Sequence, residues 1–401
     1  MNIRDRFIEY VKIDTQSDES SNTYPSTTKQ LDLAKKLVEE LQQLGISNAY
    51  LDKYGIVYAK IPTNTDEIVD KIGLIAHMDT SPDCSGKGVE PRIIEKYNGE
   101  DIVLNKDEKI ILDTKTFPSL LKNVGETLVV TNGKTLLGAD DKAGIAIIMT
   151  FIEKLLASGI KQGQISIAFT PDEEIGRGTD NFNIEEFDAD YAYTLDGGDI
   201  HYIEYENFNA ASAIVKIHGI SIHPGSAKDK MINSILVAEE FNDLLPSDMI
   251  PSKTEGYQGF NHLCDIKGNC EYTEMEYIIR NHTKSIFEKQ KKDFEIAKNI
   301  LNHKYGYEIV EVIIEDSYEN MRTYIEKDPR SLDRAVNVYK KLNIEHEFEP
   351  IRGGTDGARL TVMGLPTPNL GTGGYNYHGR FEYASLTQMS KMVDILLELV
   401  K

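Results

Sequence analysis

His77 and Asp79 close the apolar run Ile72-Gly-Leu-Ile-Ala-His-Met-Asp-Thr80. Such a run is typical of a buried strand. Because residues two apart on an extended chain face the same side, the imidazole and the carboxylate can converge just beyond the strand. This pairing suits metal ligation, with the carboxylate either binding the ion directly or orienting the imidazole. An H-x-D pair by itself also occurs at ordinary surface and core positions, so a site needs further residues.

More acids and a second histidine stand where other strands or turns are expected to end. They are Asp140-Asp141, Glu173-Glu174, Asp196 and, in a glycine-rich loop, His378. Each has a plainer interpretation: a helix N-cap for the aspartate pair, a solvated turn for the glutamate pair, and simple turn or loop residues for the others. An open α/β sheet binds ligands beyond the carboxyl ends of its strands, where all these groups would gather. For the plainer interpretations to hold, every one of these residues would have to fall at the strand ends of one sheet by chance.

The combined set of side chains indicates a pair of metal ions. Two histidines with three or four carboxylates favour a borderline-soft divalent metal such as zinc, and are too rich in nitrogen for calcium. They are too many for one tetrahedral ion, whereas two ions about 3.5–4 Å apart, bridged by one carboxylate and one water, would use them all. Asp140, in a tight turn before a buried helix, is the preferred bridge. P-loop, GxGxxG, HExxH and GxSxG motifs are missing, so metal-assisted hydrolysis is the chemistry that remains.

Strands and helices alternate around these groups. We expect strands near 48–52, 56–61, 72–77, 164–170, 191–195, 346–350 and 367–370, and helices over 2–12, 26–45, 145–156, 330–342, 355–363 and 385–400. Residues 83–135 predict an irregular insertion with short β segments. The alternation is typical of an α/β domain in which a mixed sheet carries helices on both faces.

The pattern changes after Glu206, and 401 residues are too many for one compact core. Expected strands at 210–218, 272–280 and 308–314, with helices at 230–243 and 284–302, describe a smaller α+β domain. We therefore predict a discontinuous catalytic domain over 1–206 and 319–401, with a second domain inserted at 207–318.

The composition restricts the partners and the compartment. With 65 acidic and 44 basic residues the formal charge is −21, which repels phosphate backbones and anionic lipids, so neither nucleic acid nor a membrane is an expected partner. Three cysteines without a C-x-x-C pair argue against a disulfide framework or a thiolate zinc site. The amphipathic N-terminus, which carries acids, is neither a signal nor a transit peptide, and a cytoplasmic protein is expected.

Eight runs carry a resemblance to one family. In chain order they are IAHMDTSPD, LLGADDKAG, FTPDEEIGRG, YTLDGG, IHPGSAK, IRGGTDGARL, MGLPTPNLGTGG and NYHGRFE. The ordered set resembles the co-catalytic zinc exopeptidases, which include carboxypeptidase G and succinyl-diaminopimelate desuccinylase, and most closely their tripeptide aminopeptidases. The resemblance implies release of the N-terminal residue from tripeptides by a water activated by two zinc ions. It also implies a cis peptide between Asp140 and Asp141, small peptides as partners, and an inserted lid domain that often mediates homodimers.

The resemblance further implies a role for each site residue. The metal ligands would be His77 and Asp196 on one zinc, Glu174 and His378 on the other, and Asp140 bridging both. Asp79 would orient His77 and set its basicity. Glu173 would be the general base that takes a proton from the attacking water and passes it to the leaving amine.

Three residues of the chain resemble the family's substrate-binding residues. His223, in Ile222-His-Pro-Gly, would bind substrate and stabilise the oxyanion, although a histidine before a proline is also an ordinary turn residue. Arg280 and Arg352 would grip the peptide's C-terminal carboxylate. Relatives follow the first arginine with an aspartate, whereas this chain has Asn281, which leaves the partner of Arg280 open.

Other functions remain possible on the same scaffold. Fold and metals do not determine the substrate, so a dipeptidase and an N-acyl-amino-acid deacylase are close rivals. A metal- or peptide-binding protein without catalysis is a different class. Glu173 argues against that class, because a pure binder needs no base beside its ligands.

Overall fold

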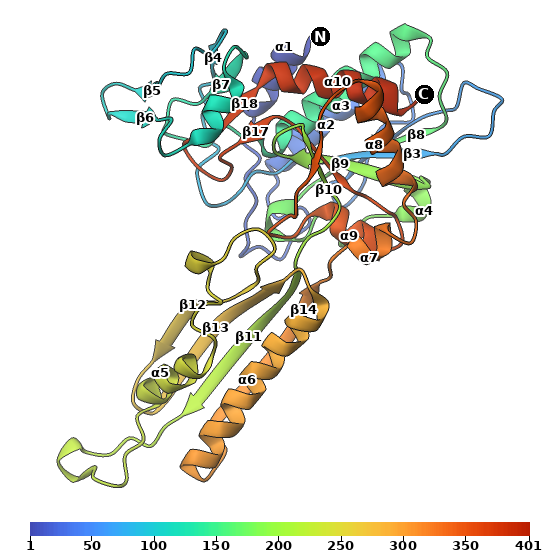
Figure 1. Ribbon diagram of the computed structural model, residues 1–401. Coiled ribbons are helices and arrows are strands. Elements are labelled where there is room, and N and C mark those ends of the chain that lie inside the picture. The colour runs from blue at the N-terminus through green and yellow to red at the C-terminus, as the bar shows by residue number, and fades with distance from the viewer. The chain divides into compact units, whose positions relative to one another are not determined.

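The computed structural model describes residues 1–401, which divide into two compact units (Figure 1). Unit 1 comprises Met1–Tyr205, Thr323–Glu349 and Thr355–Lys401, and unit 2 comprises Glu206–Arg322 and Pro350–Gly354. Our expected boundaries put Glu206 and residues 319–322 and 350–354 in the first domain instead. Arg352 explains part of the difference, because its guanidinium donates hydrogen bonds to backbone carbonyls of the 254–258 segment in unit 2.

An eight-stranded mixed sheet forms the centre of unit 1. Its strands, in spatial order, are β1 (Tyr50–Leu51), β2 (Val57–Ile61), β8 (Ile165–Thr170), β3 (Ile72–His77), β9 (Tyr191–Gly197), β16 (Asn369–Gly371), β10 (Tyr202–Glu204) and β15 (Glu347–Phe348). The four strands from β8 to β16 run parallel, with His77 opposite Thr170. The predicted mixed sheet is confirmed, and its parallel centre is the part that is buried on both sides.

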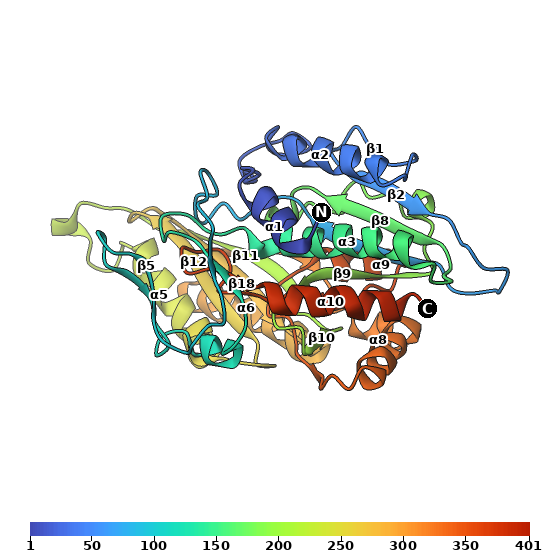
Figure 2. The ribbon, with the colours of Figure 1, turned by 90° about the horizontal axis from the view of Figure 1, so that it is seen from above.

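Helices cover both faces of this sheet, as the sequence predicts (Figure 1), and Figure 2 looks onto one of these two faces. Successive strand side chains alternate, so Leu74 of β3 belongs to one apolar cluster and Ile75 to the other. The helices of the first cluster are α1 (Ile3–Val11), α2 (Gln30–Gln43), α3 (Ala139–Ser158), α8 (Arg330–Lys341) and α10 (Leu386–Leu399). Those of the second are α4 (Ile184–Phe187) and α9 (Asp356–Val362).

Helix α3 begins earlier than the expected start at Ile145. Gly138 precedes it in the left-handed region, with φ of 83°, and Asp140 and Asp141 have non-helical backbone angles inside its first turn. The peptide between these two aspartates is cis, as the resemblance implies. Gly144 lets the helix lie against β9, because a Cβ there would stand only 1.9 Å from the carbonyl oxygen of Leu195. The close approach delivers both aspartates to the ends of the parallel strands.

The insertion at 83–135 forms a small sheet with the chain's C-terminal part. In spatial order its strands are β17 (Gly374–Tyr375), β18 (Tyr383–Ser385), β7 (Leu128–Val130) and β4 (Arg92–Ile94), and beside it lie the hairpin of β5 (Ile102–Asn105) and β6 (Ile110–Leu112) and the turn η1 (Pro118–Asn123). The pairing of β17 with β18 closes the loop that carries His378.

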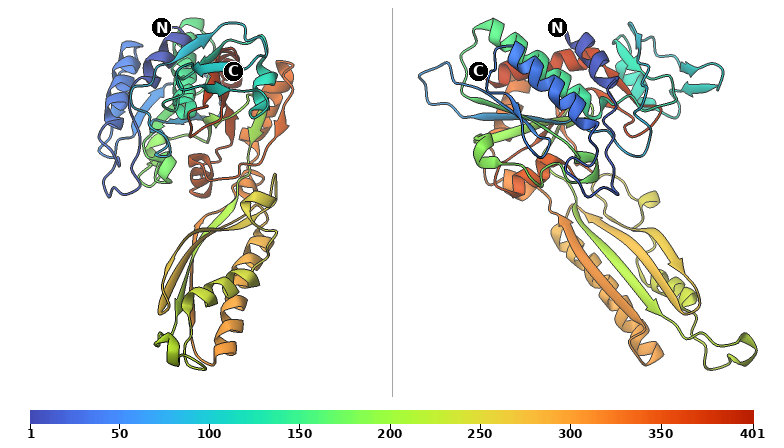
Figure 3. Two further views of the ribbon diagram at one scale, coloured as in Figure 1. Left: turned by 90° about the vertical axis from the view of Figure 1, so that its left-hand side faces the viewer. Right: turned by 180° about the vertical axis from the view of Figure 1, so that it is seen from behind.

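Unit 2 is an α+β domain inserted in the chain of unit 1 (Figure 3). Its antiparallel strands, in spatial order, are β12 (Phe260–Gly268), β13 (Tyr272–Asn281), β11 (Asn209–His218) and β14 (Val310–Tyr318), and its main helices are α5 (Ser234–Leu244) and α6 (Lys284–Tyr305). The short turns η3 (Pro224–Ser226) and η4 (Pro251–Lys253) lie in the same unit, and α7 (Arg322–Ile325) follows β14. Both main helices pack on one apolar cluster of the sheet. No helix of either unit is long and apolar enough to span a bilayer.

Candidate metal centre

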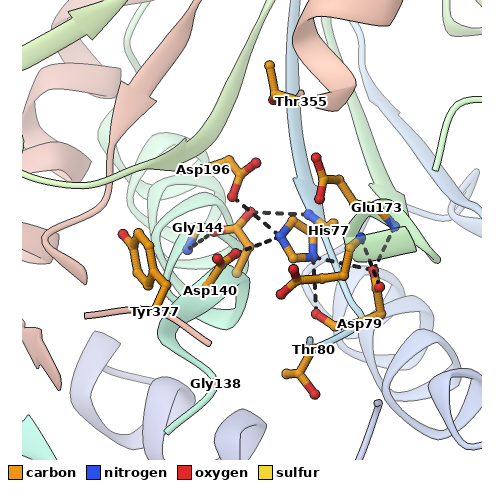
Figure 4. A network of polar contacts seen from close by, with 12 residues as sticks. His77, Asp79, Thr80, Gly138, Asp140, Gly144, Glu173, Asp196, Thr355 and Tyr377 are labelled. Atoms are coloured by element: carbon orange, nitrogen blue, oxygen red, sulfur yellow. Dashed lines mark hydrogen bonds and ion pairs between the residues drawn. The ribbon is translucent and has the colours of Figure 1, made fainter. Parts of the chain in front are cut away.

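The candidate ligands meet at the carboxyl ends of the parallel strands. His77 ends β3, Asp196 lies in β9, and Glu173–Ile175 form the short helix η2 just after β8. The first turn of α3 supplies Asp140, and the loop between β17 and β18 supplies His378. Parallel neighbours end at one edge of a sheet, which is why these distant segments converge. In Figure 4 the ring of His77 lies between the two aspartates on one side and Glu173 on the other.

We call the group of His77, Asp140 and Asp196 the inner position. Nε2 of His77 lies 2.7 Å from Oδ1 of Asp140 and 3.3 Å from Oδ1 of Asp196. Nδ1 lies 3.0 Å from the backbone oxygen of Asp79, which can only accept a hydrogen bond. This contact places the ring hydrogen of the neutral tautomer on Nδ1 and leaves the Nε2 lone pair for a cation. His77 is only 2% exposed.

We call the group of Asp140, Glu174 and His378 the outer position. Nε2 of His378 lies 2.8 Å from Oε2 of Glu174 and 3.4 Å from Oδ2 of Asp140. Asp140 therefore offers one oxygen to each histidine, which is the geometry that a carboxylate bridging two ions requires. The His378 side chain is 44% exposed, and its backbone φ is 62°.

Asp79 is fully buried and connects both positions. Its Oδ1 lies 3.3 Å from Nδ1 of His77. The same carboxylate accepts hydrogen bonds from the backbone N–H groups of Glu173, at 2.9 Å, and Glu174, at 3.2 Å. Ligand atoms of Glu173, His77 and Asp196 lie within 4.8 Å of one another, so the geometry admits Glu173 as a ligand as well as a base.

Burial and crowded charge shift the pKa values of the site. Burial opposes the charged ring of His77, but Asp196, Asp140 and Asp79 outweigh it and hold its pKa well above 6.5. Burial, with the charge of Asp140, raises the pKa of Glu174 to about 8. Burial also raises the pKa of Asp196 to about 6. Without a metal, the site therefore holds protons where a cation would neutralise its carboxylates.

The residues present fit a pair of divalent cations. Oε1 of Glu174 is buried and has no hydrogen-bond partner, which leaves a carboxylate oxygen available to a metal. Hydrogen bonds to Asp140 and Glu174 raise the pKa of His378 to about 11. Without a metal, the protonated ring therefore supplies the positive charge that a cation would otherwise give these carboxylates. A mixed set of imidazole and carboxylate donors suits zinc and similar borderline metals.

Sequence reasoning gave no role to Asp141 and did not single out Asp356. Asp141 is buried and accepts hydrogen bonds from the backbone N–H groups of His77 and Gly144, both at 3.1 Å. Asp356 is buried and accepts one from the hydroxyl of Thr170 at 2.7 Å, and burial raises its pKa to about 7. The available signal was their place inside the quoted runs LLGADDKAG and IRGGTDGARL.

Glu382 is another buried acid to which the sequence assigns no role. It ends the quoted run NYHGRFE and lies four positions after His378. Its carboxylate accepts hydrogen bonds from the backbone N–H groups of Leu137, Gly138 and Asp140. Burial raises its pKa to about 7. No local spacing pattern reveals such contacts, since they join distant segments of the chain.

His223 lies in unit 2, on an exposed turn. Its ring Nδ1 accepts a hydrogen bond from the backbone N–H of Gly225 at 3.1 Å, so the side chain caps the turn Pro224–Ser226. This local contact is the plainer alternative that the sequence left open, and the substrate-binding role of His223 stays a prediction.

Both candidate carboxylate-binding arginines also lie in unit 2. Arg280 donates to the backbone oxygens of Ala211 and Ile279 and lies over the ring of Tyr318. Arg352 donates to the backbone oxygens of the 254–258 segment and lies over Phe208 and Phe260. Backbone carbonyls are therefore the partners of Arg280, which the sequence left open. Asn281, in place of the usual aspartate, donates instead to the side chain of Gln290.

Comparisons with known proteins agree with this fold. Over 398 residues the chain is 53% identical to Peptidase T of Clostridium acetobutylicum, covering 99% of this chain and 98% of that one. Two solved structures, aminopeptidase PepT from Bacillus cereus and a tripeptidase from Staphylococcus aureus, match with TM-scores of 0.78 at 20% and 21% identity, covering 100% of this chain and 97% of each. YXEP of Bacillus subtilis, described as a dinuclear metal-binding peptidase, matches with a TM-score of 0.65 at 13% identity over 99% and 97% of the two chains.

The sequence profile of peptidase family M20/M25/M40 matches residues 130–401. These residues include Asp140, the glutamate pair after β8, Asp196 and His378. Together with the full-length identity above 50% to a curated relative, this match is decisive. The chain belongs to peptidase family M20/M25/M40.

Proposed function

We propose that the protein is a metal-dependent aminopeptidase that releases the N-terminal residue from tripeptides. The observation that carries the proposal is the convergence of His77, Asp140 and Glu174 at the sheet edge, with ligand atoms within 4.8 Å of one another. The 53% identity to a Peptidase T over nearly the whole chain supports the choice of substrate.

The proposed cofactor is a pair of zinc ions. His77 and Asp196 would hold the first ion, Glu174 and His378 the second, and Asp140 would bridge them. The two oxygens of Asp140, each facing a different histidine, support this assignment. A second ion also agrees with the dinuclear site named for the distant Bacillus subtilis relative.

Bound together, such ions lower the pKa of a water and polarise a carbonyl oxygen. The protein's own contribution to the reaction is proton transfer and positioning. Glu173 takes the proton of the attacking water on its carboxylate and returns it to the leaving amine. Burial and the charge of Asp196 raise the pKa of Glu173 well above 4.5, which suits a group that must both accept and release a proton near neutral pH. Asp79 holds the backbone of Glu173 and the ring of His77 in one geometry.

Unit 2 is the proposed lid and the candidate surface for a homodimer, and it would supply the contacts to the peptide. His223 would stabilise the oxyanion, and Arg280 and Arg352 would bind the C-terminal carboxylate. Each arginine would then exchange at least one backbone carbonyl for the carboxylate, since both already donate to such oxygens.

A pair of variants tests the proposal, with zinc content and peptide cleavage measured on the same preparations. We expect the wild-type protein to cleave Xaa-Yaa-Zaa peptides much faster than dipeptides or N-acyl amino acids. Glu173→Ala should keep two zinc ions but lose nearly all turnover, whereas Glu174→Ala should lose one ion. Comparable rates on dipeptides would contradict the tripeptidase assignment. Loss of zinc from Glu173→Ala would make Glu173 a ligand, which its place beside His77 and Asp196 also allows.

A further inference from the structure

The outer position needs Glu174 and, from two further segments that are far apart in the sequence, Asp140 and His378. Asp140 comes from the turn before the apolar part of α3, and His378 from the loop between β17 and β18. Glu382 belongs to the same loop as His378, and its carboxylate contacts the backbone of the turn that carries Asp140. It is 1% exposed, so this contact is made in the interior of unit 1.

Glu382 holds the backbone of the turn that carries Asp140. Oε2 accepts hydrogen bonds from the N–H groups of Leu137, at 2.6 Å, and Gly138, at 2.8 Å, while Oε1 accepts one from Asp140 itself, at 3.1 Å. Hydrogen bonds to a charged acceptor are stronger than those between neutral groups. One side chain therefore holds three backbone N–H groups of a turn that is not paired with any strand.

The charge of Glu382 has a buried partner. Lys142 is also about 1% exposed, and its Nζ donates to the backbone oxygen of Ile13 at 2.7 Å. Burial lowers the pKa of Lys142 to about 8, and the charge of Glu382 is the largest influence opposing that shift. Two charged groups are thus buried in this region, and such burial is costly unless the charges are hydrogen-bonded or paired.

The other end of Glu382 is equally well supported. Its backbone N–H donates to the oxygen of Gly379, and the next residue, Tyr383, pairs with Tyr375 across β17 and β18. The loop that carries His378 is thus closed directly at Glu382. The side chain links this closed loop to the turn of Asp140, and it sets how far Asp140 and His378 stand apart.

The inner position shares Asp140 with the outer one, but its other two ligands, His77 and Asp196, are held independently of this link. His77 lies at the end of a paired strand, and its backbone N–H donates to Asp141. The backbone N–H of Asp196 donates to the side chain of Asn369 at 3.0 Å. Neither contact involves Glu382.

We propose that Glu382 is a positioning residue that couples the Asp140 turn to the His378 loop and thereby determines the affinity of the outer metal ion. The inference rests on the two-ion site of the proposed function. It predicts that loss of the Glu382 carboxylate weakens one of two metal sites selectively.

Zinc titration of the full-length protein tests this, with free Zn²⁺ set by a competing chelator and without any turnover. Glu382→Gln keeps the shape and one oxygen but loses the charge, and Glu382→Ala removes all three acceptor contacts. The matched control is Glu126→Gln, an acid that accepts hydrogen bonds from Ser385 and Gln388 without touching the Asp140 turn. We expect Glu382→Gln to weaken the second-bound ion about 10–100-fold, as for other residues that orient metal ligands, and to weaken the first much less.

Peptide cleavage then separates positioning from a general loss of structure. We expect saturating Zn²⁺ to restore most of the kcat of Glu382→Gln, while Glu126→Gln behaves as wild type at every zinc concentration. Equal weakening of both ions, or no rescue by zinc, would overturn the inference, and so would an unchanged second ion in both Glu382 variants. A wild-type protein that binds fewer than two ions would overturn the two-ion proposal itself, which the wild-type titration reveals independently of any variant.

Discussion

The inner and outer positions use the same kinds of side chain but have different support. His77 and Asp196 come from paired strands, and their backbone N–H groups bond to Asp141 and Asn369. Glu174 and His378 come from a short turn and a loop, and His378 is 44% exposed where His77 is 2% exposed. Identical donors can therefore differ in rigidity and in access to water. The inner position should hold its ion more firmly and exchange it more slowly.

Removal of each histidine in turn gives the largest expected contrast. His77→Ala leaves Asp140 and Asp196 crowded without the ring that partners them, and breaking such a buried pair costs about 3–5 kcal/mol. His378→Ala removes a half-exposed partner, which costs about 1 kcal/mol or less. We expect denaturant unfolding of the metal-free variants to show this difference. Equal losses of stability would show that the two positions are equally supported.

Chelation should separate the two ions in time. Because the outer ligands lie on a turn and a loop, a chelator should remove one ion quickly and the second slowly. Activity should fall with the first phase, since the proposed mechanism needs both ions. Metal content measured against time after addition of the chelator checks this. A single phase that releases both ions together would contradict the distinction between the positions.

The pH dependence of the metal-free protein gives a smaller effect. Burial raises the pKa of Asp196 from 3.8 to about 6 and that of Glu174 from 4.5 to about 8. Where the folded-state pKa lies above the unfolded one, the folded protein binds more protons, so stability falls as pH rises through that interval. We expect the Tm in chelator to fall from about pH 4 to about pH 8, and the stabilisation by zinc to grow.

The variant Glu174→Gln measures the contribution of Glu174 to this pH dependence of the Tm. The interval of Asp196 ends near pH 6, and above it Glu174 contributes together with Asp356, Glu382 and the two histidines, whose pKa values are also raised. The variant should therefore make the upper part of the Tm profile less steep while the lower part persists. A metal-free Tm that stays constant or rises with pH would refute the sign of these shifts.

The sequence predicts the catalytic sheet well, because its central strands are continuous apolar runs. The strand expected at 72–77 is β3 itself, and β8 and β9 differ from expectation by one or two residues. Edge elements are harder to predict. Strand β12 was not expected, since most of its side chains are exposed and its composition carries no apolar period. The start of α3 was placed too late because Asp140 and Asp141 depart from helical geometry.

The candidate site likewise contains residues that the sequence predicts and residues that it does not. Residues that follow apolar runs, such as His77 and Asp196, could be proposed because strand ends share one edge, and the structure does bring them together. Their catalytic roles stay predictions. Contacts that depend on backbone N–H groups, as those of Asp141 and Glu382 do, leave no trace in residue spacing. The arginines illustrate the reverse case, because a charged side chain that resembles a substrate-binding residue can already be bonded to carbonyl groups.

The order of the site residues along the chain has a consequence during synthesis. The candidate ligands run from His77 to His378, and β16, which pairs with β9 in the centre of the sheet, is separated from it in the chain by the whole inserted unit. Contacts between such distant segments form late, because the intervening chain must first be made and ordered. A ribosome-bound chain that ends before residue 378 lacks the full ligand set. Growing chains should therefore carry no peptidase activity until synthesis is nearly finished.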